Sequence, residues 1–177
     1  MHATAMKYGR EFFEKYGAPG WTVVEIGSQE VEGQGQREGA LRQAAPERSE
    51  YIGVDMAAGL GVDVVADDPY SLPFNYGMAD AVVSSSTFEH VDFFWLTFLE
   101  MCRICKPGGY IYLNSPSNGP VHRHPVDCWR FYPDAAQALT KWADYGGYQL
   151  EVVETFIGEP DPDRAHWEDW VCVWRKK

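Results

Sequence analysis

The stretch TVVEIG at residues 22–27 decides the fold of this chain. Its β-branched and apolar residues make a short run that is typical of a buried strand, and Gly27 ends that run. Similar runs follow at residues 51–54, 62–66 and 79–84. Because helical segments separate the runs, we expect parallel strands with both faces of the sheet covered.

The rest of the chain alternates in the same way. The pattern predicts helices over residues 4–17, 37–45, 93–105 and 133–145, and further strands over 110–113, 150–156 and 170–174. We expect the last two strands to form an antiparallel pair. No repeat, low-complexity tract or linker interrupts the sequence. It therefore predicts a single domain over residues 1–177, with an N-terminal helix at 4–17 and a core over 20–177.

The charge of the chain excludes several classes of partner. Its net charge is −11, and its densest basic cluster is the terminal Arg175-Lys176-Lys177. Such a surface repels phosphate backbones and anionic lipid, so we expect neither a nucleic-acid nor a membrane partner. No apolar run approaches the ~20 residues that cross a bilayer, and residues 1–16 lack the apolar centre of a signal peptide. We therefore expect a cytoplasmic protein.

Two of the four cysteines, Cys102 and Cys105, form a C-x-x-C motif. Such a motif is compatible with zinc or redox chemistry, but no second cysteine pair follows it. We interpret both residues as small buried residues of the helix predicted over 93–105.

Polar residues follow the predicted parallel strands, where ligands bind in open parallel sheets. Asp55 is placed to accept hydrogen bonds from ribose hydroxyls, Asp67 or Asp68 from an adenine amine, and Glu25 to face an ammonium group. Each carboxylate taken alone is as well explained as a helix cap or a solvated loop residue. Together, acids at successive strand ends favour an adenosine-bearing, cationic ligand without phosphates.

The glycines after the first strand distinguish two cofactors. A dinucleotide site needs G-x-G-x-x-G, whereas residues 27–33 read GSQEVEG and place two carboxylates where a pyrophosphate would lie. This spacing disfavours NAD. The positive charges of S-adenosylmethionine suit the acidic site better.

An ordered series of short motifs resembles the class I S-adenosylmethionine-dependent methyltransferases over residues 20–157. The motifs are VVEIG at 23–27, YIGVD at 51–55, residues 68–74, ADAVV at 79–83, FEHV at 88–91 and KPGG at 106–109. The segment from residue 93 to 133 resembles a bacterial subgroup of the methyltransferase type 11-like proteins. This resemblance implies a Rossmann-like three-layer αβα sandwich around a seven-stranded, mostly parallel sheet whose last strand is antiparallel.

The resemblance also implies S-adenosylmethionine as the cofactor and roles for individual residues. It implies that Glu25, Gly27 and Ser28 approach the methionine part of the cofactor. Asp55 and Met56 would hold the ribose, and Asp68 or Asp67 the adenine. Ser84, Ser85 and Ser86 would line the methionine side.

The chain departs from the family in the glycine-rich loop. The glycines expected two and four residues after Gly27 are replaced by Gln29 and Val31, and Gly33, Gly35 and Gly39 follow later. A second hypothesis is therefore a non-catalytic or diverged module that binds S-adenosylmethionine or S-adenosylhomocysteine.

We expect the acceptor site to come from the long loop at residues 114–131, the N-terminal helix or a second subunit. The loop is the favoured acceptor lid, because loops of that length usually serve a function. The acceptor would be a small molecule or a glycan-like metabolite. Candidate catalytic residues are His90, His124 and Asp127, since a protonated acceptor needs a base. Candidate substrate-binding residues are His122, Trp129, Arg130 and Tyr132.

Packing or backbone hydrogen bonding explains each of these residues equally well. The pair His122 and His124, joined by Asp127 or His90, has the chemistry of a divalent-metal site, but nothing in the sequence defines its geometry and we assign no metal. The abundant aromatic residues also suggest a homodimer.

Overall fold

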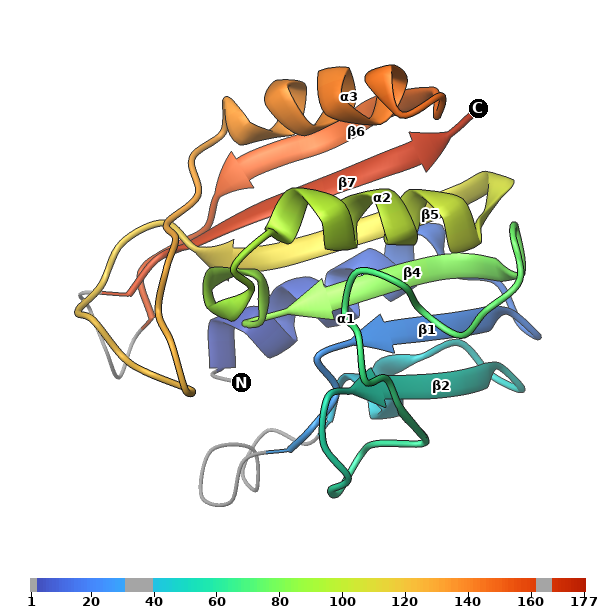
Figure 1. Cartoon of the computed structure of the whole chain (residues 1–177), viewed down its shortest axis with the longest axis horizontal. Helices are drawn as coiled ribbons and strands as arrows, with labels where there is room; N and C mark the ends of the chain where they lie inside the picture. Colours follow the sequence, from blue (N-terminus) through green and yellow to red (C-terminus); the bar gives the residue numbers. More distant parts are fainter. Residues whose placement is uncertain (1–2, 31–39, 162–166) are drawn as a thin grey trace.

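The computed structural model describes residues 3–30, 40–161 and 167–177. Its centre is a seven-stranded sheet in the order β3-β2-β1-β4-β5-β7-β6 (Figure 1). The strands are β1 (Thr22–Ile26), β2 (Glu50–Asp55), β3 (Val64–Val65), β4 (Ala79–Ser85), β5 (Cys105–Pro116), β6 (Leu150–Ile157) and β7 (Asp169–Lys176). The pairs from β3 to β5 are parallel, and β7 is antiparallel to both of its neighbours. The predicted fold class is confirmed.

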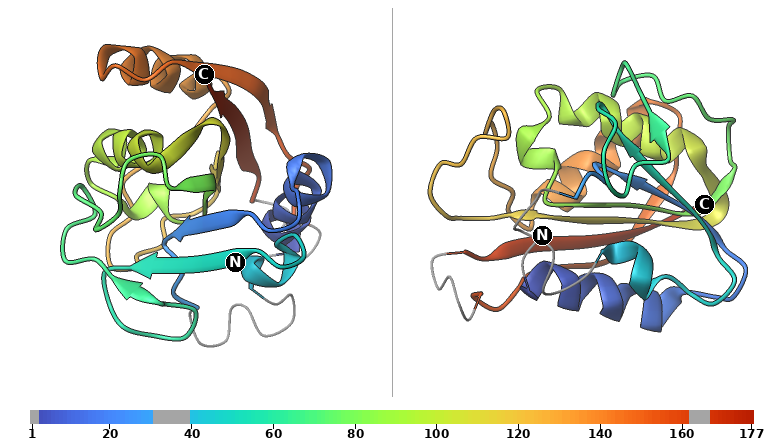
Figure 2. Two further views of the ribbon diagram at one scale, coloured as in Figure 1. Left: turned by 90° about the vertical axis from the view of Figure 1, so that its right-hand side faces the viewer. Right: turned by 90° about the horizontal axis from the view of Figure 1, so that it is seen from below.

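Helices cover both faces of the sheet, as Figure 2 shows. The helix α1 (Ala3–Tyr16) packs on one face, whereas α2 (Phe94–Ile104) and α3 (Ala135–Tyr145) pack on the other. Alternation along β1 explains both contacts, because Val23 lies in the α1 cluster and Val24 in the opposite one. The described helices include none long and apolar enough to cross a bilayer.

The core beneath α2 and α3 contains two fully buried tryptophans of β7. Trp170 donates its indole N–H to Thr155 Oγ1 at 2.9 Å, and Trp174 donates to Thr140 Oγ1 at 2.9 Å. Each buried indole therefore has the partner that its burial requires.

Two predicted elements differ from the structure. The helix expected over 37–45 is a short 3-10 turn, η1 (Leu41–Ala44), which stops before Pro46, and residues 37–39 lie outside the described residues. The strand predicted at 62–66 pairs only over Val64–Val65. Neighbouring Gly59 and Gly61 and the acids that follow favour turns over extended pairing.

The helix predicted over 93–105 includes Cys105, but in the structure Cys105 begins β5, while Cys102 lies within α2. Both side chains are buried, and burial raises the pKa of the Cys105 thiol to about 12. The buried Lys176 ammonium donates to the backbone oxygens of both cysteines at 2.8 Å. The pair therefore belongs to the core, as the sequence analysis favoured.

The register of the parallel strands brings their carboxyl ends level. Ile26 pairs with Val54 on one side and with Ser84 on the other, and Ser85 pairs with Asn114. The arrowheads of β1, β2, β4 and β5 therefore lie along one edge in Figure 1, and the loop after β5 extends from the same edge. This carboxyl edge carries the predicted site residues.

Candidate active site

The end of β1 lies in close contact with the loop that follows β4. Gly27 has a φ of 78°, and a Cβ at this position would lie 2.1 Å from Thr87 Oγ1. The amides of Gly27 and Ser28 both donate to the backbone oxygen of Val54, at 2.9 and 3.1 Å. Only glycine meets both demands, since it tolerates a positive φ and has no side chain to clash.

Asp55 occupies the tip of β2, where its carboxylate is held by two backbone amides. Gln29 N donates to Oδ2 at 2.9 Å and Met56 N donates to Oδ1 at 2.7 Å. Gln29 thus contributes its amide to the site although it replaces a family glycine. The Met56 side chain is 62% exposed, and the nearby Ser28 hydroxyl is buried without a hydrogen-bond partner among the described residues.

Glu25 is buried on the α1 side of the sheet rather than open to solvent. The Tyr51 hydroxyl donates to Glu25 Oε2 at 2.9 Å, and the Arg42 guanidinium lies 5.0 Å from the Tyr51 ring centroid. Burial raises the pKa of the Glu25 carboxyl to about 7, although the Tyr51 hydrogen bond acts in the opposite direction. The carboxyl is therefore poised to change its charge near neutral pH.

The two acids after β3 are both exposed. Asp68 Oδ1 accepts a hydrogen bond from Tyr70 N at 2.8 Å, which makes the residue part of a local turn. Asp67 lies beside it on the surface. The structure thus places both acids past the end of β3, and their contact with an adenine stays a prediction.

The serines at the end of β4 differ in what their hydroxyls do. Ser84 Oγ donates to the Ile26 oxygen at 2.8 Å, and Ser85 Oγ donates to Asn114 Oδ1 at 3.3 Å, so both link neighbouring strands. Ser86 has a φ of 52°, and its buried hydroxyl has no hydrogen-bond partner among the described residues. A non-glycine residue in this conformation is strained, as residues at functional sites often are.

Three of the predicted histidines meet at the carboxyl edge although they are far apart in sequence. The ring centroids of His90 and His122 are 4.8 Å apart, and His124 lies 5.8 Å from each. His90 ends the 3-10 turn η2 (Phe88–His90), whereas the other two belong to the loop after β5. The structure therefore brings together residues for which the sequence gives no distance.

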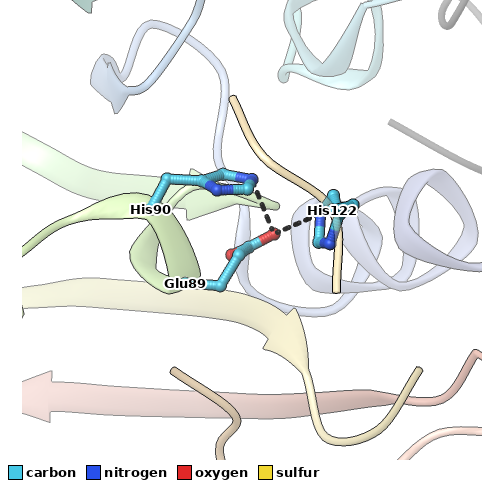
Figure 3. A group of neighbouring side chains, drawn as sticks. All are labelled: Glu89, His90 and His122. Atoms are coloured by element: carbon cyan, nitrogen blue, oxygen red, sulfur yellow. Dashed lines mark ion pairs between the residues drawn. The ribbon is translucent and has the colours of Figure 1, made fainter. Parts of the chain in front are cut away.

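A fourth member of this group, Glu89, was not singled out from the sequence. Its Oε1 lies 3.6 Å from His90 Nε2 and 3.9 Å from His122 Nε2, as Figure 3 shows. The Glu89 side chain is 1% exposed, and burial raises its pKa to about 8. In the sequence, only its place in the FEHV motif points to Glu89, and the prediction named His90 of that motif instead.

The two imidazoles differ in the contact of their other nitrogen. His90 Nδ1 lies 2.6 Å from the Val126 oxygen, within hydrogen-bond distance. His122 Nδ1 lies 3.3 Å from Asp127 Oδ2 but makes no hydrogen bond among the described residues. Partial burial lowers the pKa of both histidines. Both rings have Nε2 toward Glu89. We call Glu89, His90 and His122 the histidine–glutamate cluster.

Asp127 and Arg130, predicted as catalytic and substrate-binding residues, form an ion pair with each other. Arg130 donates to Asp127 Oδ1 at 2.6 Å and to Oδ2 at 2.9 Å, and Arg130 also donates to the Pro120 oxygen. The same Oδ2 accepts the His122 amide at 2.7 Å. The guanidinium holds the pKa of Asp127 far below its usual range. This pair ties together the two sides of the loop.

The remaining predicted residues lie at the outer side of the loop. Trp129 donates its indole N–H to the Val91 oxygen at 3.0 Å and packs edge-on against Phe94. Tyr132 is 61% exposed. At the base, Phe131 N donates to the Pro116 oxygen at 3.0 Å, so the loop closes on itself.

Comparison with known proteins identifies the fold. Residues 33–113 match a family model described as a methyltransferase domain. A search of curated proteins finds no match. Similar solved structures include the N1-methyltransferase for 1,6-didemethyltoxoflavin from Burkholderia thailandensis, solved with that compound and S-adenosylhomocysteine (TM-score 0.68, 15% identity, covering 98% of this chain and 78% of that one).

Two further structures resemble the whole fold. One is a complex of the Trm112 methyltransferase activator with a candidate methyltransferase of Haloferax volcanii (TM-score 0.66, 20% identity, 98% and 89% of the two chains). The other is a S-adenosylmethionine-dependent methyltransferase of Methanosarcina mazei (TM-score 0.67, 13% identity, 93% and 96%). Residues 33–113 are thus similar to a methyltransferase domain, and the described chain shares the fold of these methyltransferases.

Proposed function

We propose that the protein transfers the methyl group of S-adenosylmethionine to a small-molecule or glycan-like acceptor bound beneath the loop at residues 114–131. One observation carries the proposal. The ends of β1 and β2 lie level, so Gly27 and Asp55 share the carboxyl edge of the sheet. Thr87 contacts Gly27 at this edge and directly precedes the 3-10 turn that ends at His90. Cofactor and acceptor groups therefore share one edge of the sheet.

The cofactor lies across the ends of β1, β2 and β3 in this proposal. Asp55 accepts from the ribose hydroxyls with Met56 beside it, Asp68 or Asp67 contacts the adenine, and the methionine part lies along residues 25–28 and 84–86. The match to a methyltransferase domain and the neighbour with bound S-adenosylhomocysteine support this cofactor. The buried hydroxyls of Ser28 and Ser86 supply hydrogen-bonding groups on the methionine side.

The acceptor lies beneath the loop, facing the histidines. Methyl transfer is an in-line displacement, so the protein's main contribution is to hold the acceptor atom opposite the methyl group. His90 and His124 are the groups we propose on the acceptor side, with His122 beside them. Asp127 and Arg130 act together to hold the loop, because each occupies the other's hydrogen-bonding groups. Trp129 and Tyr132 form the outer wall.

Isothermal titration calorimetry with S-adenosylhomocysteine tests the cofactor site. We expect binding to the full chain and a loss of about tenfold or more in Asp55→Ala, since each hydroxyl–carboxylate hydrogen bond contributes about 1.5–3 kcal/mol. Asp144→Ala is the matched control, because Asp144 is an exposed acid near the end of α3, away from the carboxyl edge. Equal binding by both variants, or no binding at millimolar ligand, contradicts the proposal.

The second candidate is a diverged module that binds the cofactor without transferring methyl. The altered glycine loop motivates it, but residues 31–39 lie outside the described residues. Release of S-adenosylhomocysteine in the presence of a panel of hydroxylated small molecules distinguishes the two functions. Binding without turnover on any acceptor would favour the module.

The same proposal covers the setting in which the protein acts. We propose a cytoplasmic protein without a nucleic-acid partner, and a homodimer as its assembly. The net charge of −11 supports the exclusion of nucleic acid. Light scattering after size-exclusion chromatography tests the dimer, and a monomeric mass at high concentration would contradict it.

A further inference from the structure

The histidine–glutamate cluster combines three ligand types in one buried place. One oxygen of Glu89 and one nitrogen each of His90 and His122 lie within 4.8 Å of one another. Two imidazoles and one carboxylate, with further positions open, are the ligand set of several catalytic zinc and iron sites. The turn η2 and the loop after β5 supply these groups from opposite sides, as Figure 3 shows.

The hydrogen bond of the His90 ring determines which of its nitrogens faces Glu89 with a lone pair. The Val126 carbonyl has no proton to give, so His90 Nδ1 donates to it and Nε2 carries the lone pair. His122 Nδ1 lies 3.3 Å from Asp127 Oδ2 but makes no hydrogen bond among the described residues, so its tautomer is not determined in this way. The Nε2 atoms of both rings and Oε1 of Glu89 thus converge on one space, and at least the His90 nitrogen carries a lone pair.

Such a convergence is unfavourable unless something positive lies between the groups. Glu89 Oε2 is also buried without a hydrogen-bond partner among the described residues, so the carboxylate is poorly satisfied from both sides. A carbonyl or carboxylate that orients a histidine from its far nitrogen is the usual support of a metal ligand. His90 has such a support in the Val126 carbonyl, whereas Asp127 accepts the backbone amide of His122 and lies 3.3 Å from its Nδ1.

We propose that Glu89, His90 and His122 bind a divalent transition-metal ion, for which Zn²⁺ is the reference probe. Ligand atoms around tetrahedral zinc are about 3.3 Å apart, so side-chain shifts of about 1 Å close the site. The sequence predicted no metal, because nothing in it defines the geometry of His122 and His124 with Asp127 or His90, and Glu89 was not among the residues considered. Asp127 instead supports His122, and His124 is exposed beside the cluster.

The consequence for catalysis rests on the proposed function, whereas the binding of the ion does not. An open coordination position would take a hydroxyl oxygen of the acceptor and lower its pKa, so that its proton is released to water. The oxygen's electron pair then forms the O–C bond while the C–S bond breaks and its pair stays on sulfur. The acceptor class is therefore a hydroxylated molecule, methylated on oxygen.

Metal binding is tested with the full chain after treatment with a chelator. The exposed Cys128 thiol, 3.5 Å from Asp92 Oδ1, is first removed as a competing ligand by Cys128→Ser. We expect one Zn²⁺ per chain in competition with a chromogenic chelator, and a rise in the melting temperature with Zn²⁺. The Co²⁺-loaded protein should show the intense visible absorption of a tetrahedral or five-coordinate ion.

Substitutions distinguish the proposed metal ligands from the residues around them. We expect Glu89→Gln, His90→Asn and His122→Asn each to weaken Zn²⁺ binding by about 100-fold or more, and Asp127→Asn by about 10-fold to 100-fold through His122. His124→Asn is the matched control and should change the affinity by less than about twofold. Circular dichroism confirms that each variant is folded, and Glu89→Gln keeps the shape of the buried side chain.

Two outcomes overturn the metal site. One is the absence of Zn²⁺ and Co²⁺ binding at ~1 mM, which would mean that a shared proton occupies the cluster. The other is unchanged binding in both histidine variants. Calorimetry with S-adenosylhomocysteine on the same metal-free protein tests the proposed function separately, because no residue proposed for the cofactor belongs to the cluster.

Discussion

The two halves of the carboxyl edge are built in different ways. On the proposed cofactor side, Asp55 and Asp68 accept hydrogen bonds from nearby backbone amides, and the acids after β3 are exposed. On the proposed acceptor side, a carboxyl group that is 1% exposed lies between two imidazoles. Asp55 and Asp68 are thus satisfied by nearby backbone amides, whereas Glu89 is buried and incompletely satisfied. The names cofactor half and acceptor half refer to these two proposed sides.

This difference indicates where each half obtains its specificity. The cofactor half is formed largely by the backbone, so its structure depends on the close contact between the end of β1 and the loop after β4. The acceptor half depends on the contacts of His90 with the Val126 oxygen and of His122 with Asp127. Because Val126 and Asp127 belong to the loop after β5, the structure of this half depends on that loop. Changes in one half should therefore leave the other largely intact.

The largest effect is expected for Gly27→Ala. The new Cβ would overlap Thr87, and alanine would also adopt a φ of 78°. Overpacking costs about 1–3 kcal/mol and a left-handed backbone about 1 kcal/mol more, so we expect a loss of about 3 kcal/mol in the free energy of unfolding. Urea denaturation measures this loss, and S-adenosylhomocysteine binding should be lost with it.

Two variants divide that effect into its parts. Gly20 has a φ of 81° with nothing near its would-be Cβ, so Gly20→Ala should cost only the backbone part, about 1 kcal/mol. Replacing Thr87 by glycine in the Gly27→Ala background should recover most of the steric part. Equal losses for Gly27→Ala and Gly20→Ala would show that the contact with Thr87 does not shape the edge.

The next effect concerns the charge of Glu25. Burial raises its folded-state pKa to about 7, above the value in the unfolded chain, so the folded protein holds this proton more tightly. The stability contributed by the protonated form is present at low pH and declines as the pH rises toward 7. At 1.36 kcal/mol per pKa unit, the free energy of unfolding of the wild type should fall by about 2 kcal/mol between pH 5.5 and 8.5 because Glu25 loses its proton.

Glu25→Gln removes that dependence while it keeps an acceptor for the Tyr51 hydroxyl. Between pH 5.5 and 8.5 the free energy of unfolding of the variant should therefore rise by about 2 kcal/mol relative to that of the wild type. Urea denaturation at both pH values measures this difference. A stability difference that stays constant with pH would mean that Glu25 does not titrate in this range. If the cofactor's ammonium group lies beside Glu25, S-adenosylhomocysteine binding near pH 6 should also release a proton from the wild type alone.

The two halves also differ in how well the sequence predicted them. The strands were recognisable because β-branched runs and their terminal glycine or acid are local features, so Gly27 and Asp55 fell at the expected edge. The histidine–glutamate cluster depends on contacts across more than 30 residues of chain, such as that between His90 and Val126. No local pattern encodes such a contact, and Glu89 resembled an ordinary acid of a short turn.

The smallest effect is expected where the loop is held. Arg130→Lys keeps the charge but loses the second hydrogen bond to Asp127 and the contact with the Pro120 oxygen, which only a planar, forked group makes together. The pair is only partly shielded from solvent, so we expect a loss of about 1 kcal/mol, seen as a lower midpoint of urea denaturation.

Because this ion pair supports His122 and not the backbone around Gly27, Arg130→Lys should weaken Zn²⁺ binding measurably and leave S-adenosylhomocysteine binding within about twofold. Arg123→Lys, at an exposed arginine of the same loop, is the matched control and should change neither. Weakened binding of both ligands in Arg130→Lys would mean that the two halves of the edge form one cooperative unit. In that case the loop would organise the cofactor half as well as the acceptor half.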